Sequence, residues 1–336
     1  MKILVFFNNK GGVGKTTLVY HLAYMFSRMG VRTLAVDCDP QANLTSAFLG
    51  ESELERIWPE SGEGISIMAA LRPFIEGTGD IGRAPIEEID ENLHLVCGDL
   101  ELSRFEDDLS LQWPQCADGK LPAFRIESSF YRISKNAAES VNAELIIMDV
   151  GPNLGAINRA ALLCADHIVM PLAADIYSLQ GLRNLGPAIK RWGEEWSERT
   201  KIFQRKNPNA NLPLPNGRMK PAGYVVMQPV MRLDRPVKAY GRWTKRIPHA
   251  FRTHIMQKNS SINEEPGDDP NCLAILRNYA SLMPYALDAR KPVFDLRPAD
   301  GALGGHLEAV RRCKTEFTRL AKKIADVCGI SVEAKD

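Results

Sequence analysis

Short runs of consecutive apolar residues recur along the chain, and glycine, proline or aspartate closes each run. Continuous runs predict strands that are buried on both faces, because a half-exposed strand would alternate apolar and polar residues. Between the runs lie segments with apolar residues at helical spacing, such as Thr16 to Arg28 and Tyr177 to Trp192. This alternation predicts an α/β fold, with a doubly wound, mostly parallel sheet and helices on both faces. The five predicted strands cover residues 1–8, 31–39, 144–149, 166–175 and 220–230.

Two segments do not follow this alternation of strands and helices. We therefore expect one domain over residues 1–336 with two insertions. Residues 50–140 show few clear elements apart from a strand at 92–98. Residues 196–221 are rich in proline and asparagine, and we expect a long exposed loop there. Toward the end of the chain, the apolar spacing predicts a basic helix or helix pair over Pro236–Gln257 and a further helix over residues 306–327.

Charge is distributed unevenly along the chain, although the formal net charge is only +1. Residues 51–110 hold 16 acidic and four basic residues, whereas residues 200–258 hold 13 basic residues and one acid. Opposed patches of this size favour a polyanionic partner on the basic face, with a pair of solvated loops as the plainer alternative.

Several other classes of protein are disfavoured. The seven cysteines include no C-x-x-C pair, so neither a zinc site nor a cluster site is predicted. We find no signal peptide, and no window approaches the roughly 18 apolar residues of a membrane span. We therefore expect a cytoplasmic protein with reduced thiols and no membrane partner.

The first predicted strand leads into the glycine-rich stretch KGGVGKTT, residues 10–17. A glycine loop between a strand and a helix binds phosphate, because its backbone N–H groups and the helix N-terminus point at the anion. We expect Lys15 to reach the β- and γ-phosphates of a nucleotide and Thr16 to ligate Mg²⁺. The predicted phosphate site consists of Gly11, Gly12, Val13, Gly14, Lys15 and Thr16.

Carboxylates close two of the predicted strands. Asp149 ends the run LIIMD, and we expect it to join the Mg²⁺ site through water. Asp37 and Asp39 end another run, and one of them can orient an attacking water as a general-base-like group. Because parallel strands place their carboxyl ends at one sheet edge, these aspartates are predicted to meet beside the glycine loop.

A second lysine, Lys10, precedes the first glycine of the loop. The backbone there directs its side chain away from phosphates held by its own loop. It can instead reach the phosphates of a facing subunit and stabilise charge that develops during γ-phosphate transfer, much as an arginine finger does. We therefore expect Lys10 to act in trans across a homodimer.

Three segments resemble the signature segments of the ParA/Soj branch of the MinD/ParA ATPases, P-loop NTPases with a deviant Walker A loop: KGGVGKTT, VDCDPQANLT and LIIMDVGPNLGAINRAALLCADHIVMPL. The resemblance covers residues 1–50 and 143–195 well. It implies an ATP-dependent sandwich dimer and Mg²⁺-dependent ATP hydrolysis that is weak until a partner stimulates it. It also implies that Lys10 is the signature lysine and that Asp39 positions the water. Further nucleotide contacts implied by the resemblance are Thr17 at the α-phosphate, with Gln228 and Pro298 at the base.

Members with this core bind nonspecific DNA through basic residues near their C-terminal helices, and a ParB-like or other activating protein releases them. The resemblance thus implies a nucleoid-associated protein that partitions or positions a plasmid, a chromosome or another cargo. Contacts to DNA phosphates would make such binding independent of sequence and strongly dependent on salt. The candidate DNA-binding residues are Arg232, Arg235, Lys238, Arg242, Lys245, Arg246, Arg311, Arg312, Lys314 and Arg319.

Three alternatives stay open. The chain could be an ATP-switched recruiting protein of a mobile-element or defence module, acting through its insertions with little DNA binding. A MinD-like membrane ATPase would need an amphipathic C-terminal anchor, which CGISVEAKD does not supply. A metabolic ATP-dependent synthetase on the same fold would not need a lysine that acts in trans.

Overall fold

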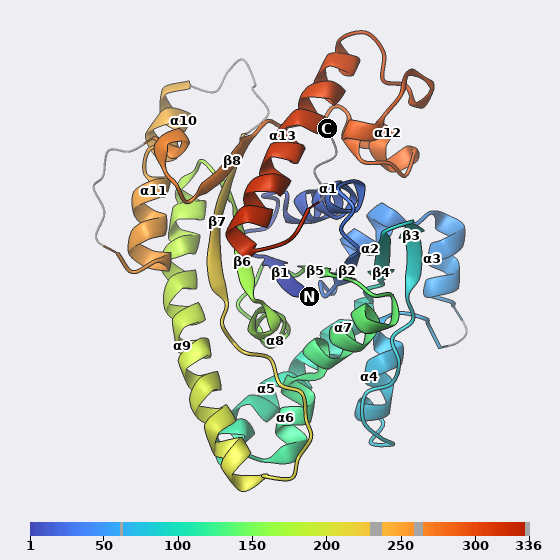
Figure 1. Ribbon diagram of the computed structural model, residues 1–336, viewed down its shortest axis with the longest axis vertical. Helices are drawn as coiled ribbons and strands as arrows, with labels where there is room; N and C mark the ends of the chain where they lie inside the picture. The colour runs from blue at the N-terminus through green and yellow to red at the C-terminus, as the bar shows by residue number, and fades with distance from the viewer. Residues whose placement is uncertain (61–62, 229–236, 259–264, 333–336) are drawn as a thin grey trace.

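A computed structural model describes residues 1–60, 63–228, 237–258 and 265–332, with the backbone alone at 237–240. Its centre is an eight-stranded sheet in the order β3-β4-β2-β5-β1-β6-β7-β8 (Figure 1). Every neighbouring pair is parallel except the antiparallel pair β3 and β4, so the predicted fold class is confirmed. The strands are β1 Lys2–Phe6, β2 Thr33–Asp37, β3 Glu87–Asp90, β4 Leu93–Val96, β5 Leu145–Asp149, β6 His167–Ala173, β7 Lys220–Met227 and β8 Cys272–Leu276.

Helices cover both faces of the sheet, which explains the continuous apolar runs. Along β1, Ile3 and Val5 pack into the core beneath α4 to α9, whereas Leu4 and Phe6 pack into the core beneath α1, α2 and α13. The helices are α1 Lys15–Arg28, α2 Asn43–Phe48, α3 Glu51–Ile57, α4 Ile67–Ile75, α5 Phe105–Gln115, α6 Leu121–Glu127, α7 Ser129–Ser140, α8 Ala156–Cys164, α9 Ile176–Lys206, α10 Val237–Thr244, α11 Ile247–Ala250, α12 Met283–Asp288 and α13 Gly305–Cys328.

The acidic segment 50–140 is far more regular than the sequence suggested. It supplies α3 to α7 and two sheet strands, of which β4 matches the strand expected at 92–98. Its helices are part of the core, because Phe105, Leu109 and Phe124 are fully or almost fully buried. The expectation of few clear elements was therefore wrong.

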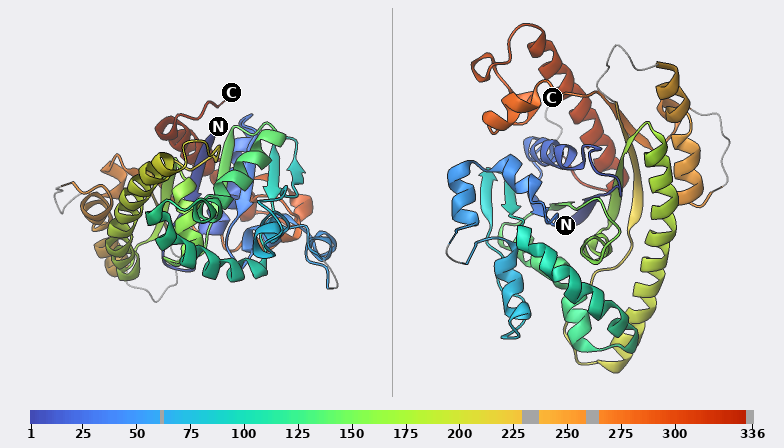
Figure 2. Two further views of the ribbon diagram at one scale, coloured as in Figure 1. Left: turned by 90° about the horizontal axis from the view of Figure 1, so that it is seen from below. Right: turned by 180° about the vertical axis from the view of Figure 1, so that it is seen from behind.

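Helix α9 is the second large difference from the sequence prediction. It continues to Lys206, well beyond the expected end at Trp192. In both figures it runs along the molecule, with α10 and α11 beside one end and α5 and α6 beside the other (Figures 1 and 2). The chain after it is not simply exposed, because Trp196 Nε1 donates to Pro215 O at 2.8 Å and Leu212 and Leu214 pack against the core.

A polar cluster joins α5, α6, α8 and α9. Arg159 and Arg199 place their guanidinium groups 4.3 and 3.9 Å from the ring centroid of Trp113. Arg159 also pairs with the fully buried Glu127 at 3.2 Å, and Arg199 pairs with Glu195 at 2.9 Å. These contacts attach α5 and α6 of the acidic segment to α8 and α9. Within the described ranges, no helix is long and apolar enough to cross a membrane.

Candidate nucleotide site

The glycine-rich loop leaves β1 and enters α1 at Lys15. Gly12 and Gly14 have φ of 71° and 80°, in the left-handed region that favours glycine. A side chain on Gly14 would also press against Met227 Cε at 3.2 Å. The loop therefore curls over the N-terminus of α1, where the helix dipole and free N–H groups favour an anion.

Lys15 is the buried cation of this loop, with only 7% of its surface exposed. Burial lowers the pKa of its ammonium, while the carboxylates of Asp149 and Asp39 act in the opposite direction. A bound phosphate would add negative charge beside a cation that has lost most of its hydration. This arrangement fits the predicted role of Lys15.

Thr16 and Asp149 are brought together, as their predicted roles require. Thr16 Oγ1 donates to Asp149 Oδ2 at 2.6 Å, across the gap between α1 and the end of β5. Burial and the charge of Asp37 raise the pKa of Asp149 to about 8. Its other oxygen, Oδ1, is buried without a hydrogen-bond partner.

These two side chains fit a Mg²⁺ site at which a bound nucleotide supplies further ligands. A hydroxyl and a carboxylate are the hard oxygen donors that Mg²⁺ prefers, and the unpartnered oxygen is free to accept from a metal-bound water. Throughout the part of the chain that the structure describes, no three His, Cys, Asp or Glu side chains converge as ligands. Water and phosphate oxygens would therefore complete the coordination.

The structure distinguishes the two aspartates at the end of β2. Asp37 Oδ2 accepts from Thr45 N at 2.9 Å and from Thr45 Oγ1 at 2.8 Å, so this carboxylate holds α2 in place. Asp39 accepts only from the nearby Gln41 N, at 3.0 Å, among its described side-chain contacts. A Cβ on Gly151 would lie 3.4 Å from Asp39 Oδ1, so Asp39 faces the loop that follows β5. Asp39 is therefore the better placed of the two to orient a water.

Lys10 points to the start of α9 rather than back into its own loop. Its ammonium forms an ion pair with Asp175 and lies 5.6 Å from the ring centroid of Tyr177. Ile176 and Tyr177 are 53% and 70% exposed, so an apolar surface adjoins this lysine. Sequence reasoning missed both partners, although Asp175 closes the predicted strand at 166–175.

Thr17 is held through its backbone by a residue that the sequence did not single out. His21 Nδ1 donates to Thr17 O at 2.7 Å, and His21 Nε2 accepts from Val293 N at 3.1 Å. The imidazole also stacks on Phe317 of α13, with ring centroids 4.9 Å apart. His21 thereby connects the helix of the phosphate loop to the C-terminal part of the chain.

The sequence predicts two contacts to the nucleotide base, from Gln228 and Pro298. Gln228 directly follows Met227, the residue against Gly14, and its N–H donates to Leu276 O at 2.9 Å. Pro298 is exposed at the start of a short 3₁₀ turn and shares no described hydrogen bond with the loop. The structure thus places Gln228 near the phosphate loop, and the base contact of Pro298 stays a prediction.

The basic residues of α13 form an exposed row. Arg312 pairs with Glu308 at 2.6 Å, which reduces its free charge. Lys323, also on α13, donates to Cys272 O at 2.5 Å and ties α13 to β8. The predicted DNA contacts that are exposed on α13 are Arg311, Arg312, Lys314 and Arg319.

The second basic strip is only partly described. The predictions for Arg232 and Arg235 lie outside the described residues, as does the side chain of Lys238. Lys245 is exposed and pairs with Glu265 at 2.8 Å. The exposed Arg242 and Arg246 stack on Trp243, at 4.6 and 5.1 Å from its ring centroid.

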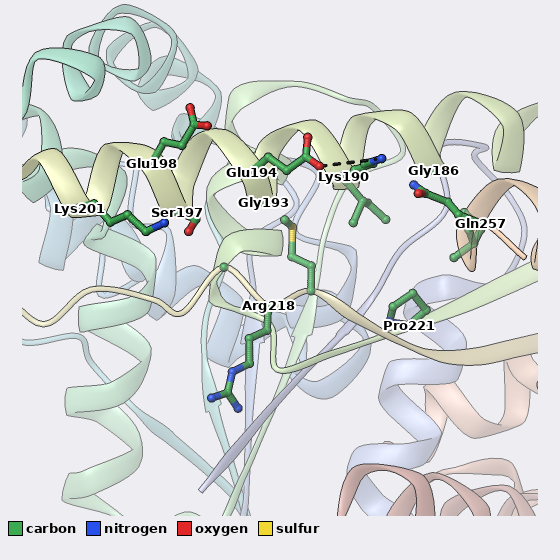
Figure 3. A pocket seen from close by; sticks show the side chains of 14 residues that line it. Gly186, Lys190, Gly193, Glu194, Ser197, Glu198, Lys201, Arg218, Pro221 and Gln257 are labelled. Atoms are coloured by element: carbon green, nitrogen blue, oxygen red, sulfur yellow. Dashed lines mark ion pairs between the residues drawn. The ribbon is translucent and has the colours of Figure 1, made fainter.

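A separate groove of about 510 Å³ lies between α9 and the chain entering β7 (Figure 3). Lys190 and Glu194 form an ion pair of 3.9 Å on its wall, and Lys201 and Arg218 also line it. Its lining includes neither the glycine loop nor the aspartates, so it is not part of the candidate nucleotide site.

Comparison with known proteins gives matches in sequence and in fold. A protein-family model described as an AAA domain matches residues 1–202. The sporulation initiation inhibitor protein Soj of Bacillus subtilis is 30% identical over 191 residues, which are 55% of this chain and 63% of Soj. The match thus spans less than two thirds of Soj.

Two solved structures share the fold over almost their whole lengths. A protein from Corynebacterium diphtheriae superposes with a TM-score of 0.70 and 22% identity, covering 98% of this chain and 99% of its own. McdA from Cyanothece, described as an ATP complex, superposes with a TM-score of 0.61 and 15% identity, covering 100% of this chain and 99% of its own.

Proposed function

The chain belongs to the ParA/MinD-type P-loop ATPases, and from this premise we propose that it is an ATP-driven positioning switch. In this proposal it binds ATP with Mg²⁺, forms a homodimer and holds nonspecific DNA. A ParB-like or other activating protein then stimulates hydrolysis, and the dimer releases the DNA. The cargo is a plasmid, a chromosome or another assembly. ATP as the nucleotide is supported by the McdA complex, whose fold this chain shares.

The chemistry follows from the placement of the side chains. Bound Mg²⁺ would neutralise charge on the β- and γ-phosphates. Thr16 and Asp149 would hold it, and Lys15 would contact the same phosphates. Asp39 orients a water in line with the γ-phosphorus and accepts its hydrogen bond. The water oxygen bonds to the γ-phosphorus as the bond from that phosphorus to the β,γ-bridging oxygen breaks, which yields ADP and an inorganic phosphate that keeps the protons of the water.

In this proposal, Lys10 of one subunit acts on the ATP that the facing subunit binds. Its cis partner, Asp175, is only one third exposed and holds the ammonium at the edge of the loop. In an ATP dimer the ammonium would exchange this carboxylate for the partner's phosphates, where negative charge is greater. Exposed Ile176 and Tyr177 supply apolar surface beside it for a second copy of the chain.

The observation that carries the proposal is the contact between Thr16 Oγ1 and Asp149 at 2.6 Å beside the buried Lys15. It joins the glycine loop to the end of β5 in the arrangement that a magnesium–nucleotide site needs. The test is release of phosphate from ATP by the purified chain, with and without Mg²⁺, compared with Lys15→Ala and Asp39→Ala. We expect Mg²⁺-dependent turnover that both substitutions abolish, with ATP binding lost only in Lys15→Ala. Turnover that survives Lys15→Ala would contradict the proposal.

A further inference from the structure

Helix α5 of the acidic segment places a carboxylate on the N-terminus of α8. Glu106 Oε1 accepts from Ala156 N at 2.5 Å, and Glu106 Oε2 accepts from Ile157 N at 2.8 Å. These N–H groups belong to the first turn of α8, which has no intrahelical acceptor for them. A carboxylate at this end also interacts favourably with the helix dipole. The start of α8 is therefore fixed by a residue of a distant segment.

The loop from Asp149 to α8 is tied to the same helix. Asn158, which is almost fully buried, accepts from Gly151 N at 3.1 Å and donates to Gly151 O at 2.9 Å. Its amide also donates to Asn153 O at 2.8 Å. Since Gly151 packs against Asp39, a continuous set of contacts runs from Glu106 through α8 to Asp39, the residue proposed to orient the water.

Helix α5 is held firmly enough to transmit this constraint. Arg159 of α8 donates to Leu109 O of α5 at 3.0 Å and lies over the ring of Trp113. Glu106 itself accepts from Ala156 N and Ile157 N at the other end of this contact. These interactions join α5 to α8 along one side.

We propose that Glu106 is a positioning residue for ATP hydrolysis. It holds the start of α8, and with it the loop 150–155, so that Asp39 and Asp149 keep their places around the γ-phosphate. The inference rests on the proposed ATPase function and gives part of the acidic segment a role in it. Because Glu106 has no contact with the glycine loop among its described interactions, its loss is expected to lower turnover and spare ATP binding.

The test compares Glu106→Ala and Glu106→Gln with Asp107→Ala as the matched control. Asp107 is the neighbouring acid on α5, and it is exposed. For each protein we would measure kcat and KM for ATP with Mg²⁺, the thermal unfolding midpoint, and amide hydrogen exchange of residues 150–157. Displacing reacting groups by about 1 Å costs on the order of 10²-fold in rate, so we expect kcat of Glu106→Ala to fall by about tenfold to 100-fold.

We expect KM to stay within about twofold, since Lys15 and the loop glycines are untouched. Exchange at 150–157 should be faster in Glu106→Ala, and Glu106→Gln, which keeps one acceptor oxygen, should be intermediate in both exchange and kcat. The control should match the unmodified chain. An unchanged kcat, even with a lower unfolding midpoint, would make Glu106 merely structural and overturn the inference.

Failure of the positioning role of Glu106 and failure of the ATPase function would give different results. If the unmodified chain hydrolyses ATP and both Glu106 variants match it, the positioning role is wrong and the ATPase function stands. If the unmodified chain shows no turnover, the proposed function is contradicted. Hydrogen exchange then still tests the structural part: unchanged exchange at 150–157 in Glu106→Ala overturns the claim that Glu106 holds this loop.

Discussion

The ammonium of Lys10 forms an ion pair with Asp175 of the same chain, at the residue that caps α9. The loop that carries Lys10 thereby contacts α9, which begins at the next residue and presents exposed apolar side chains. The same carboxylate accepts from Ser178 N at 2.8 Å, so Asp175 both begins the helix and holds the lysine. In the proposed switch, this cis contact competes with engagement of a facing subunit.

Asp175→Asn should therefore favour the ATP dimer. Asparagine caps helices as well as aspartate does, so α9 keeps its start while the ion pair is lost. Partly exposed ion pairs contribute at most about 1 kcal/mol each, and a homodimer would release two of them, so we expect the dimer dissociation constant to fall by up to about 30-fold. Sedimentation velocity with ATP and with ADP would measure this. Lys10→Ala is the control, and an Asp175→Asn protein that needs more protein to dimerise would contradict the competition.

Asp149→Asn should weaken binding of ATP only when Mg²⁺ is present. The amide oxygen still accepts from Thr16, but it no longer offers a carboxylate to the metal's water shell. Loss of a residue that orients metal-bound groups costs about tenfold to 100-fold in affinity. Titration of a fluorescent ATP analogue, in Mg²⁺ and then in EDTA, would show whether the loss depends on the metal. Equal weakening of ATP binding in EDTA would show that the substitution disturbs folding of the loop and not the metal site.

The pair of Glu127 and Arg159 gives a prediction about stability and pH. Burial raises the pKa of Glu127 to about 7 even with Arg159 beside it. Arg159→Met leaves a buried carboxylate without its cation, which costs about 3 kcal/mol of unfolding free energy when the group is charged. In that variant the folded state holds the proton more tightly than the unfolded state, so the deficit is full at high pH and shrinks as the pH falls.

Urea unfolding of Arg159→Met at pH 8.5 and at pH 6 would measure this difference. The double variant with Glu127→Gln should recover much of the stability at pH 8.5, because the uncompensated charge is gone. A deficit that is the same at both pH values would show that lost packing on Trp113, rather than charge, accounts for it.

His21 should make the protein less stable in acid. Its contacts are two backbone groups and aromatic rings, and burial lowers its pKa to about 4. The unfolded chain binds this proton with an ordinary pKa of about 6.5, so stability is full above that value and is lost as the pH falls toward 4. Between pH 7.5 and 5 the loss amounts to about 2 kcal/mol. His21→Asn should lack this component when urea unfolding is compared at the two pH values, and an identical pH dependence would contradict it.

The strands and the helix around the candidate site were predicted correctly, because each is local in sequence. A continuous apolar run followed by GGVGKTT specifies a strand, a loop and a helix, and LIIMD specifies a strand that ends at Asp149. Parallel pairing of β1 with β5 then brings Thr16 to Asp149, as the rule on strand ends requires. Only the elements themselves are local, and the general rule that parallel strands end at one sheet edge predicts the contact across 133 positions.

The remaining parts depend on pairings that no local pattern records. Lys10 meets Asp175 across 165 positions, and Glu106 meets Ala156 across 50. Helix α5 was missed because its acidic first turn and internal Pro114 hide the spacing of its buried side chains. Strand β8 was also not predicted, although its apolar run CLAIL is as long as β1.

Binding to a random-sequence DNA duplex, with ATP, ADP or no nucleotide and at low and moderate salt, tests the central claim most directly. We expect tight, salt-sensitive binding with ATP alone, which Lys10→Ala abolishes and Asp39→Ala prolongs. Charge reversal at Arg311 and Lys314 on α13 should weaken it while the ATP dimer persists. An ATP dimer that binds no DNA would contradict the account and direct attention to the acidic segment as a surface that recruits another protein.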